Sequence, residues 1–151
     1  MDLLKEEYII LELIPTAISP NKGDIIQLSA LKLKGLQLQS RFDERLEERL
    51  IALEDFKELI SYDKEEFKYK SSTKEMLEDF QEWSKGLPLL ILDNVYTNNF
   101  LESLPNKKES LLKYIGKEYN DHIIEDLIEE NNIEPTNYIV DILYETLIKH
   151  L

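Results

Sequence analysis

Residues 8–20 read YIILELIPTAISP, and this short stretch decides the fold. Residues 8–14 are apolar on both alternating faces, as expected of a central strand that is buried on both sides. Pro15 and Pro20 then break regular structure, so we expect a turn after the strand. Glu12 is the one acidic residue within the strand, and Ile14 follows it two positions later.

The following residues predict a hairpin and then a helix. Residues 24–42 contain two stretches of alternating apolar and polar side chains, one on each side of Gly35. This pattern is typical of two antiparallel strands joined by a tight turn. From residue 43 the apolar period changes, and residues 43–60 predict an amphipathic helix.

A second helix and a second buried strand come next. Residues 71–86 have helical periodicity, with Ser72 or Thr73 able to cap the N-terminus and Gly86 closing the helix. Residues 87–94, LPLLILDN, form a short continuous apolar run that ends in a polar turn. We therefore expect another buried strand there.

The last third of the chain predicts mostly helices. Helices are expected over residues 98–104, 108–119, 122–132 and 135–151, the last with Pro135 in its first turn. No clear strand signal is present between residues 104 and 116. Three early strands, helices, one more strand and then helices predict a single mixed α/β domain over residues 1–151.

Composition limits the classes of function. The chain has 151 residues, 42% of them hydrophobic, and no cysteine, which excludes disulfides, thiolate nucleophiles and Cys-based metal sites. Its formal net charge of −13 repels phosphate groups, so nucleic acid is possible but disfavoured as a partner. The first residues lack the form of a signal peptide, and no apolar run is long enough for a bilayer, so we expect a cytoplasmic protein without membrane association.

Several common catalytic arrangements are missing from the sequence. It contains two histidines, His122 and His150, and neither has metal-binding spacing such as H-E-x-x-H. The G-x-S-x-G motif of hydrolases is absent, and four glycines form no phosphate-binding loop. Most familiar enzyme classes are therefore not expected.

In three segments the chain resembles the DEDD-type 3′–5′ exonucleases, which include polymerase proofreading subunits and ribonuclease T. Their first strand continues into D-x-E, T-T-G and L-S-P, and residues 8–20 followed by DIIQLSALKL match this in part. LPLLILDNVYTNNFLESL is similar to the family's P-L-V-A-H-N-A-x-F-D-x-x-F-L, and PTNYIVDILYETLIKHL is similar to its last helix. The resemblance covers nearly the whole chain and implies a ribonuclease H-like fold, a mixed sheet that begins with three antiparallel strands and adds a parallel one, flanked by helices.

The resemblance also implies a chemistry of phosphodiester hydrolysis. Enzymes of this class use two divalent ions, about 3.5–4 Å apart, to stabilise the attacking and leaving oxygens. The family holds them with a D-x-E pair on the first strand and one Asp on each of two helices. A histidine five residues before the last Asp acts as general base.

Residue by residue, most of these carboxylates are not carried over. Glu12 aligns with the first Asp and Asp141 with the last, so these two are the candidate metal ligands. The second strand position is Ile14, which cannot bind a metal. The middle Asp aligns with Asn98, or with Asn99 if the turn is one residue shorter, and an amide is a weaker ligand than a carboxylate.

The remaining family positions follow the same trend. Thr136 stands in place of the general base, and its hydroxyl has no useful basicity near neutral pH. Asp93 stands where the family usually has His and is a possible displaced metal ligand. Thr16 and Asn94 match family positions that the resemblance implies are substrate-binding. Because single catalytic groups commonly contribute about 10²–10⁴-fold in rate, we expect a degenerate nuclease.

The sequence therefore predicts a domain without catalysis that acts by binding a protein in nucleic-acid metabolism. No cofactor is expected; if activity remained, the cofactor would be Mg²⁺ or Mn²⁺. One alternative is an active 3′–5′ exonuclease with a rearranged site made by Glu12, Asp141 and Asp93. Another is an acidic inhibitor that imitates a nucleic-acid backbone. The oligomeric state is not predicted.

Overall fold

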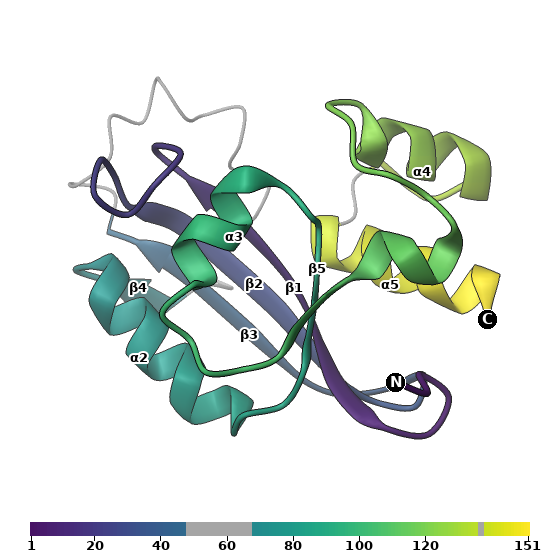
Figure 1. Ribbon diagram of the computed structural model, residues 1–151, viewed down its shortest axis with the longest axis horizontal. Helices are drawn as coiled ribbons and strands as arrows, with labels where there is room; N and C mark the ends of the chain where they lie inside the picture. The colour runs from purple at the N-terminus through teal and green to yellow at the C-terminus, as the bar shows by residue number, and fades with distance from the viewer. Residues whose placement is uncertain (48–67, 136–137) are drawn as a thin grey trace.

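The chain folds around one mixed sheet with helices on both faces, as Figure 1 shows. The computed structural model describes residues 1–47, 68–135 and 138–151. Within them the strands are β1 (Glu7–Pro15), β2 (Ile25–Lys34), β3 (Gln37–Leu46), β4 (Lys68–Lys70), β5 (Leu89–Ile91) and β6 (Lys108–Ser110). The helices are α2 (Thr73–Ser84), α3 (Val95–Leu101), the 3₁₀ helix η3 (Leu111–Ile115), α4 (Ile123–Asn131) and α5 (Ile139–His150). The α/β class expected from the sequence is confirmed.

The strand order in the sheet is β4-β3-β2-β1-β5-β6. The first three strands along the chain pair antiparallel, β1 with β2 and β2 with β3. The other pairs, β1 with β5, β5 with β6 and β3 with β4, are parallel. The long strand β1 therefore lies inside the sheet, between β2 and β5. Helices cover both of its faces, in agreement with its apolar sequence.

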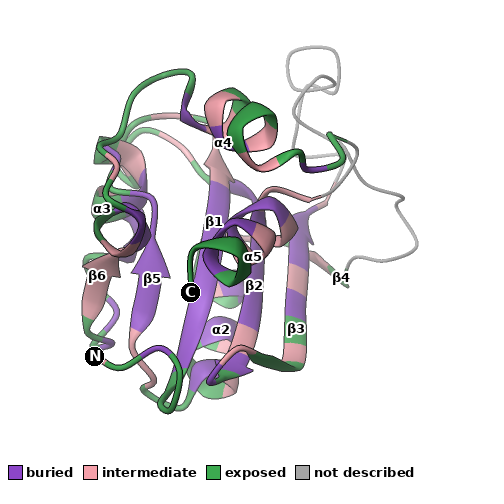
Figure 2. Ribbon diagram, turned by 90° about the vertical axis from the view of Figure 1, so that its right-hand side faces the viewer, coloured by how far each residue is buried: buried purple, intermediate pink, exposed green. Residues whose placement is uncertain are grey.

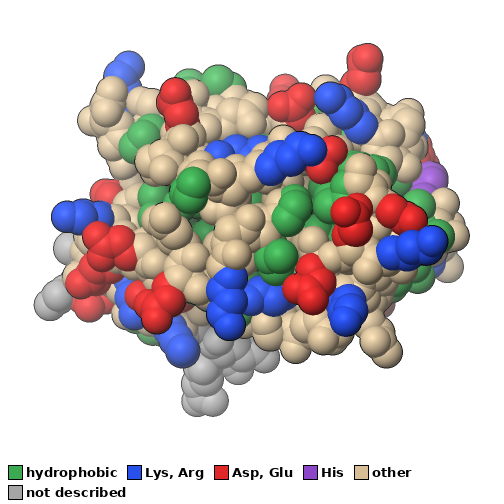
Figure 3. Space-filling model, turned by 60° about the horizontal axis from the view of Figure 1, so that its bottom comes forward, with side chains coloured by type: hydrophobic (Ala, Val, Ile, Leu, Met, Phe, Trp, Pro, Cys, Tyr) green, Lys and Arg blue, Asp and Glu red, His purple; other side chains and the backbone are tan. Residues whose placement is uncertain are grey.

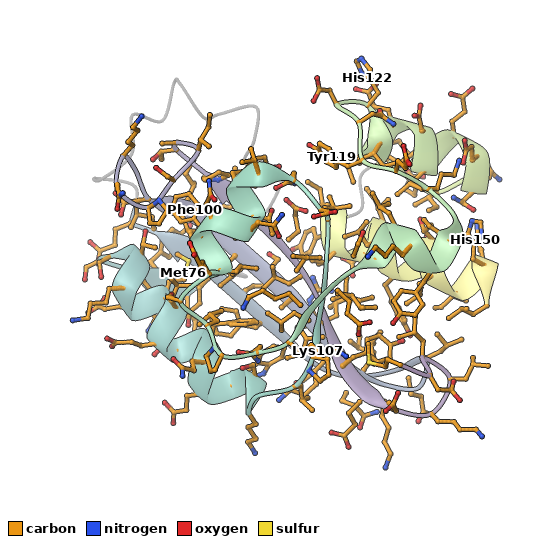
Figure 4. The ribbon with its side chains drawn as sticks, viewed as in Figure 1. Met76, Phe100, Lys107, Tyr119, His122 and His150 are labelled. Carbon is orange, nitrogen blue, oxygen red and sulfur yellow. The ribbon has the colours of Figure 1, made fainter. Side chains whose placement is uncertain are left out.

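Alternation along β1 divides the core into two layers. Tyr8 and Ile10 point to the face that η3, α4 and α5 cover, whereas Ile9, Leu11 and Leu13 point to the face that α2 and α3 cover. Met76 from α2 and Phe100 from α3, both labelled in Figure 4, belong to this second layer. Figure 2 shows β1 and β2 buried along most of their length.

The second predicted helix forms as its sequence indicates. The Ser72 hydroxyl accepts a hydrogen bond from the Glu75 N–H at 3.1 Å and so caps the N-terminus of α2. At the other end, Lys85 and Gly86 both have positive φ, which ends the helix in the left-handed conformation that glycine adopts without strain.

Three predicted elements differ from the structure. The helix expected over 43–60 is wrong at its start, because Asp43–Leu46 continues β3, and residues 48–60 lie outside the described residues. The helix expected over 108–119 is replaced by strand β6, held by backbone pairing with β5, and by the 3₁₀ helix η3. The last helix begins at Ile139 rather than Pro135, because Tyr138 has an extended conformation.

The helices that the structure describes are short; α2, α3 and α5 pack against the sheet, and α4 packs on α5. The longest, α2 and α5, have 12 residues each. None of the described helices has the length and apolar run needed to cross a lipid bilayer.

Candidate functional site

A row of polar side chains crosses the sheet on the face that α5 covers. Glu12 of β1 pairs with Ser29 of β2, which in turn pairs with Asp43 of β3. Directly opposite residues in antiparallel strands have Cβ atoms about 4.5–5.5 Å apart. Glu12 Oε2, Ser29 Oγ and Asp43 Oδ1 are all buried without a hydrogen-bond partner in the structure.

Glu12 is the most deeply buried acid of this row. Its side chain is only 6% exposed. Burial raises the pKa of Glu12 from 4.5 to about 8, and a hydrogen bond from the Leu13 backbone opposes this only in part. In the absence of a cation, burial therefore favours the protonated, uncharged form of this carboxyl group near neutral pH.

The carboxylate of Asp141 binds an arginine. Asp141 lies in the first turn of α5, and its Oδ1 accepts a hydrogen bond from Arg41 Nη1 at 2.8 Å. Arg41 Nε also donates to Asp43 Oδ2 at 3.2 Å, and the guanidinium lies 4.9 Å from the centre of the Tyr138 ring. Burial lowers the pKa of Arg41, but the hydrogen bonds and charges of Asp141 and Asp43 outweigh this and raise it. A fixed positive charge thus lies between the two acids.

Ile14, two residues after Glu12, is an apolar residue in an apolar environment. Ile14 packs against Ile26 and Leu46. Its partner across the strands is Gln27, whose Oε1 accepts two hydrogen bonds from the buried Arg45, at 2.9 and 3.1 Å. The neighbouring cross-strand positions Ile14, Gln27 and Arg45 thus contain a second guanidinium and no carboxylate.

Helix α3 brings other groups near Glu12. Asn94 is 4% exposed and caps α3, accepting a hydrogen bond from the Thr97 N–H at 2.8 Å. Burial raises the pKa of Tyr96, with further contributions from the charge of Glu12 and from Tyr119, while a hydrogen bond with Asn94 lowers it. Tyr96 and Glu12 are thus within electrostatic range of each other.

The structure places Asn98 and Asp93 elsewhere. Asn98 Nδ2 donates to Asp93 Oδ1 at 3.1 Å, and both residues line a cavity of about 360 Å³ together with Ser110 and Lys113 of the β6–η3 segment. Asn98 follows Tyr96 by two positions, about 200° around a helix, so the two side chains point to opposite sides. Among the described contacts, none joins Asn98 to Glu12 or Asp141.

The other sequence-predicted positions are structural or lie outside the described part of the chain. The Thr16 N–H donates to the Asp24 carbonyl, and the Thr16 hydroxyl accepts from the Asp24 N–H, each at 2.8 Å, so Thr16 closes the β1–β2 loop. Asn99 Nδ2 donates to the Ile18 carbonyl of the same loop at 3.1 Å. Thr136, expected in place of the general base, lies outside the described residues.

The arrangement does not fit a pair of divalent cations. Within residues 1–47, 68–135 and 138–151, no three His, Asp or Glu side chains are grouped to share an ion. Burial favours the protonated form of Glu12, and Arg41 binds Oδ1 of the Asp141 carboxylate. Magnesium prefers several charged or carbonyl oxygens in near-octahedral geometry, and the row offers too few.

Sequence reasoning found Glu12 and Asp141 but missed Arg41 and Tyr96. Arg41 lies in a stretch whose alternation predicts the second strand of a hairpin, and its partner Asp141 is 100 residues away along the chain. Neither a scan of protein-family models nor a search of curated proteins finds a match to this chain.

Proposed function

We propose that this chain is a degenerate relative of the DEDD-type exonucleases, with a ribonuclease H-like fold, that acts by binding a protein and does not cleave nucleic acid. The strand directions support the fold: three antiparallel strands, then parallel strands β5 and β6 on the other side of β1, are compatible with a ribonuclease H-like sheet. An acid on β1 and an acid on α5 also lie on the same side of the sheet, where the resemblance implies them.

The Arg41 guanidinium between Asp43 and Asp141 is the observation that carries the proposal. A nuclease of this class needs concentrated negative charge to hold two dications. Here an arginine supplies positive charge instead, and its guanidinium is not deprotonated near neutral pH. Asp141 therefore has a structural role: it holds the first turn of α5 to β3.

The surface charge supports a protein partner over nucleic acid. The net charge of −13 works against the phosphate contacts that dominate nucleic-acid affinity. On the face in Figure 3, Lys and Arg side chains are scattered among Asp and Glu and form no continuous basic patch. Basic surfaces of another protein are the natural complement of such a molecule.

A nuclease assay tests this proposal. Purified protein is incubated with 3′-ended single-stranded DNA and RNA in Mg²⁺ and in Mn²⁺, beside the variants Glu12→Gln and Asp141→Asn. We expect all three proteins to give the same background, because neither carboxyl group holds a metal. Metal-dependent cleavage by the wild type that either variant abolishes would overturn the proposal and favour an active, rearranged site.

A further inference from the structure

An acidic pair lies between β3 and α2, on the face of the sheet opposite to the row of Glu12, Ser29 and Asp43. Glu44 follows Phe42 by two positions on β3, so its side chain points toward α2. It is only 3% exposed and shares a hydrogen bond with Asp79, whose side chain is 39% exposed. An ionised carboxylate can only accept hydrogen bonds. One of the two acids must therefore carry a proton, and burial selects Glu44.

The pair connects three elements of the fold. Lys70 Nζ of β4 binds Asp79 Oδ2 at 2.6 Å. Strand β4 also pairs with β3, with Lys68 in register with Glu44. The contacts thus run from β3 through the two acids to α2 and from there to β4, which Figure 1 shows beside α2. Since the strand pairing covers three residues of each strand, we expect β4 to depend on these side-chain contacts.

Effects of opposite sign act on the two acids. Burial raises the pKa of Glu44 from 4.5 to about 8, the hydrogen bond and the charge of Asp79 add to the rise, and Lys70 and Lys68 oppose it. The pKa of Asp79 is lowered instead, first by the hydrogen bond from Lys70, against its own burial, and then by the one from Glu44. The pair therefore holds one proton and one negative charge at neutral pH.

The other surroundings of the pair are formed by β2, α2 and an adjoining cavity. The residue of β2 opposite Glu44 is the apolar Leu28. Glu75, in the first turn of α2, lies within electrostatic range of Asp79 and accepts hydrogen bonds from Ser71. The remaining charged groups that line the cavity are two of each sign: Arg41, Asp43, Glu82 and Lys85. Because these four charges sum to zero, loss of the Glu44 proton changes the net charge around the pair.

Loss of this proton would place two negative charges in contact, one of them removed from water. Any local opening that exposes Glu44 to water then becomes easier as the pH rises. Helix α2 is anchored in the core by Met76 and Phe80, which are both fully buried. Strand β4 has three residues, none of them buried, and it comes last in the order of the described strands. We therefore expect the opening at β4.

We propose that Glu44 and Asp79 form a pH-sensitive contact: their shared proton holds β4 and α2 to β3 near neutral pH, and its loss in mildly alkaline solution allows β4 to separate. Lys68 of β4 lines the cavity of about 580 Å³ between β3 and α2, so separation of β4 removes part of its wall. The pH would thereby control access to this cavity. The inference does not rest on the proposed function, because Glu12 and Asp141 lie on the other face of the sheet.

NMR of the side-chain carboxyl carbons tests whether the shared proton exists. The full chain is labelled with ¹³C, and the Glu44 signal is assigned by its loss in Glu44→Gln. We expect Glu44 to titrate near pH 8, and Asp79→Asn to move this midpoint to lower pH, because it removes a negative charge beside Glu44. Titration of Glu44 below about pH 6, or a midpoint that Asp79→Asn leaves unchanged, would overturn the shared proton.

Hydrogen exchange measures the separation of β4. Peptides over residues 68–72 are followed by millisecond labelling and mass spectrometry at pH 7 and pH 9, with correction for the intrinsic exchange rate. For an opening that returns the pKa of Glu44 from about 8 to 4.5, linkage predicts a fall in protection of about tenfold over this interval. Glu44→Gln can still donate to Asp79 but has no proton to lose, so its protection should change less than about twofold.

Two controls accompany this comparison. Glu78→Gln makes the identical chemical change on α2 at a side chain that is 64% exposed, so it should keep the tenfold fall of the wild type. Strand β6 is a second three-residue strand with parallel pairing, and its peptides should give the same protection in wild type and Glu44→Gln. A fall at β4 that persists in Glu44→Gln, or that is missing from the wild type, would overturn the inference.

Discussion

Replacing Glu12 by Gln is expected to remove the part of the loss of stability between about pH 5 and pH 9 that Glu12 contributes. Burial raises the folded-state pKa of Glu12 from 4.5 to about 8. In this window the folded state holds a proton that the unfolded state has released, so the free energy of unfolding falls as pH rises. The contribution is complete below about pH 4.5 and is lost by about pH 8.

The expected size follows from the shift. One pKa unit corresponds to about 1.36 kcal/mol, so the wild type should lose about 3–5 kcal/mol more than Glu12→Gln across the window. Urea unfolding at pH 5, 7 and 9 measures this. The comparison cancels Glu44, whose raised pKa is common to both proteins.

Glu7→Gln is the matched control for this prediction. Glu7 lies on the same strand but is exposed, so the identical chemical change should leave the pH dependence that of the wild type. Parallel stability curves for Glu12→Gln and wild type would show that Glu12 is ionised in the folded protein. A charged Glu12 would then be available as a metal ligand.

A double variant, Ile14→Glu with Arg41→Gln, is expected to create Mn²⁺ binding that the wild type lacks. In the wild type the Arg41 guanidinium is bound by the carboxylates of Asp141 and Asp43. Replacing Arg41 frees both carboxylates. The carboxylate introduced at position 14 would lie two residues from Glu12 on the same strand face. Together these changes should gain at least about tenfold in Mn²⁺ affinity, measured by calorimetry.

The control for this gain is Ile14→Gln with Arg41→Gln. It has the same shape and the same loss of arginine but one carboxylate fewer. Circular dichroism checks that both double variants remain folded. Equal, weak affinities would mean that the row does not converge on one ion even with added charge. The positions of Glu12 and Asp141 would then not correspond to those of metal ligands.

The sequence predicted the central strands because their signals are local. The apolar run of residues 8–14 and the alternation around Gly35 correspond to β1 and to the β2–β3 hairpin. Helix α2 was predicted from Ser72, which caps its N-terminus, and from Gly86, which follows its last turn. Both signals lie next to the helix in the sequence. Strand β6, by contrast, is three polar residues held by pairing with β5, and no pattern of its own predicts it.

The site was less predictable because it depends on helix phase and on distant partners. Asn98 was expected near Glu12, yet its amide donates a hydrogen bond to Asp93, and the two line a cavity with residues of the β6–η3 segment. The Arg41–Asp141 pair joins residues 100 positions apart. Such contacts follow from the packing of α5 on the sheet and leave no periodic signal in the chain.

Calorimetric titration of the unmodified protein with MnCl₂ at pH 7 measures directly whether Glu12 and Asp141 hold a divalent cation. We expect no saturable heat of binding up to millimolar Mn²⁺, because a protonated Glu12 and an Asp141 bound to Arg41 do not form a cation site. Binding of two Mn²⁺ per chain that Asp141→Asn abolishes would contradict the account.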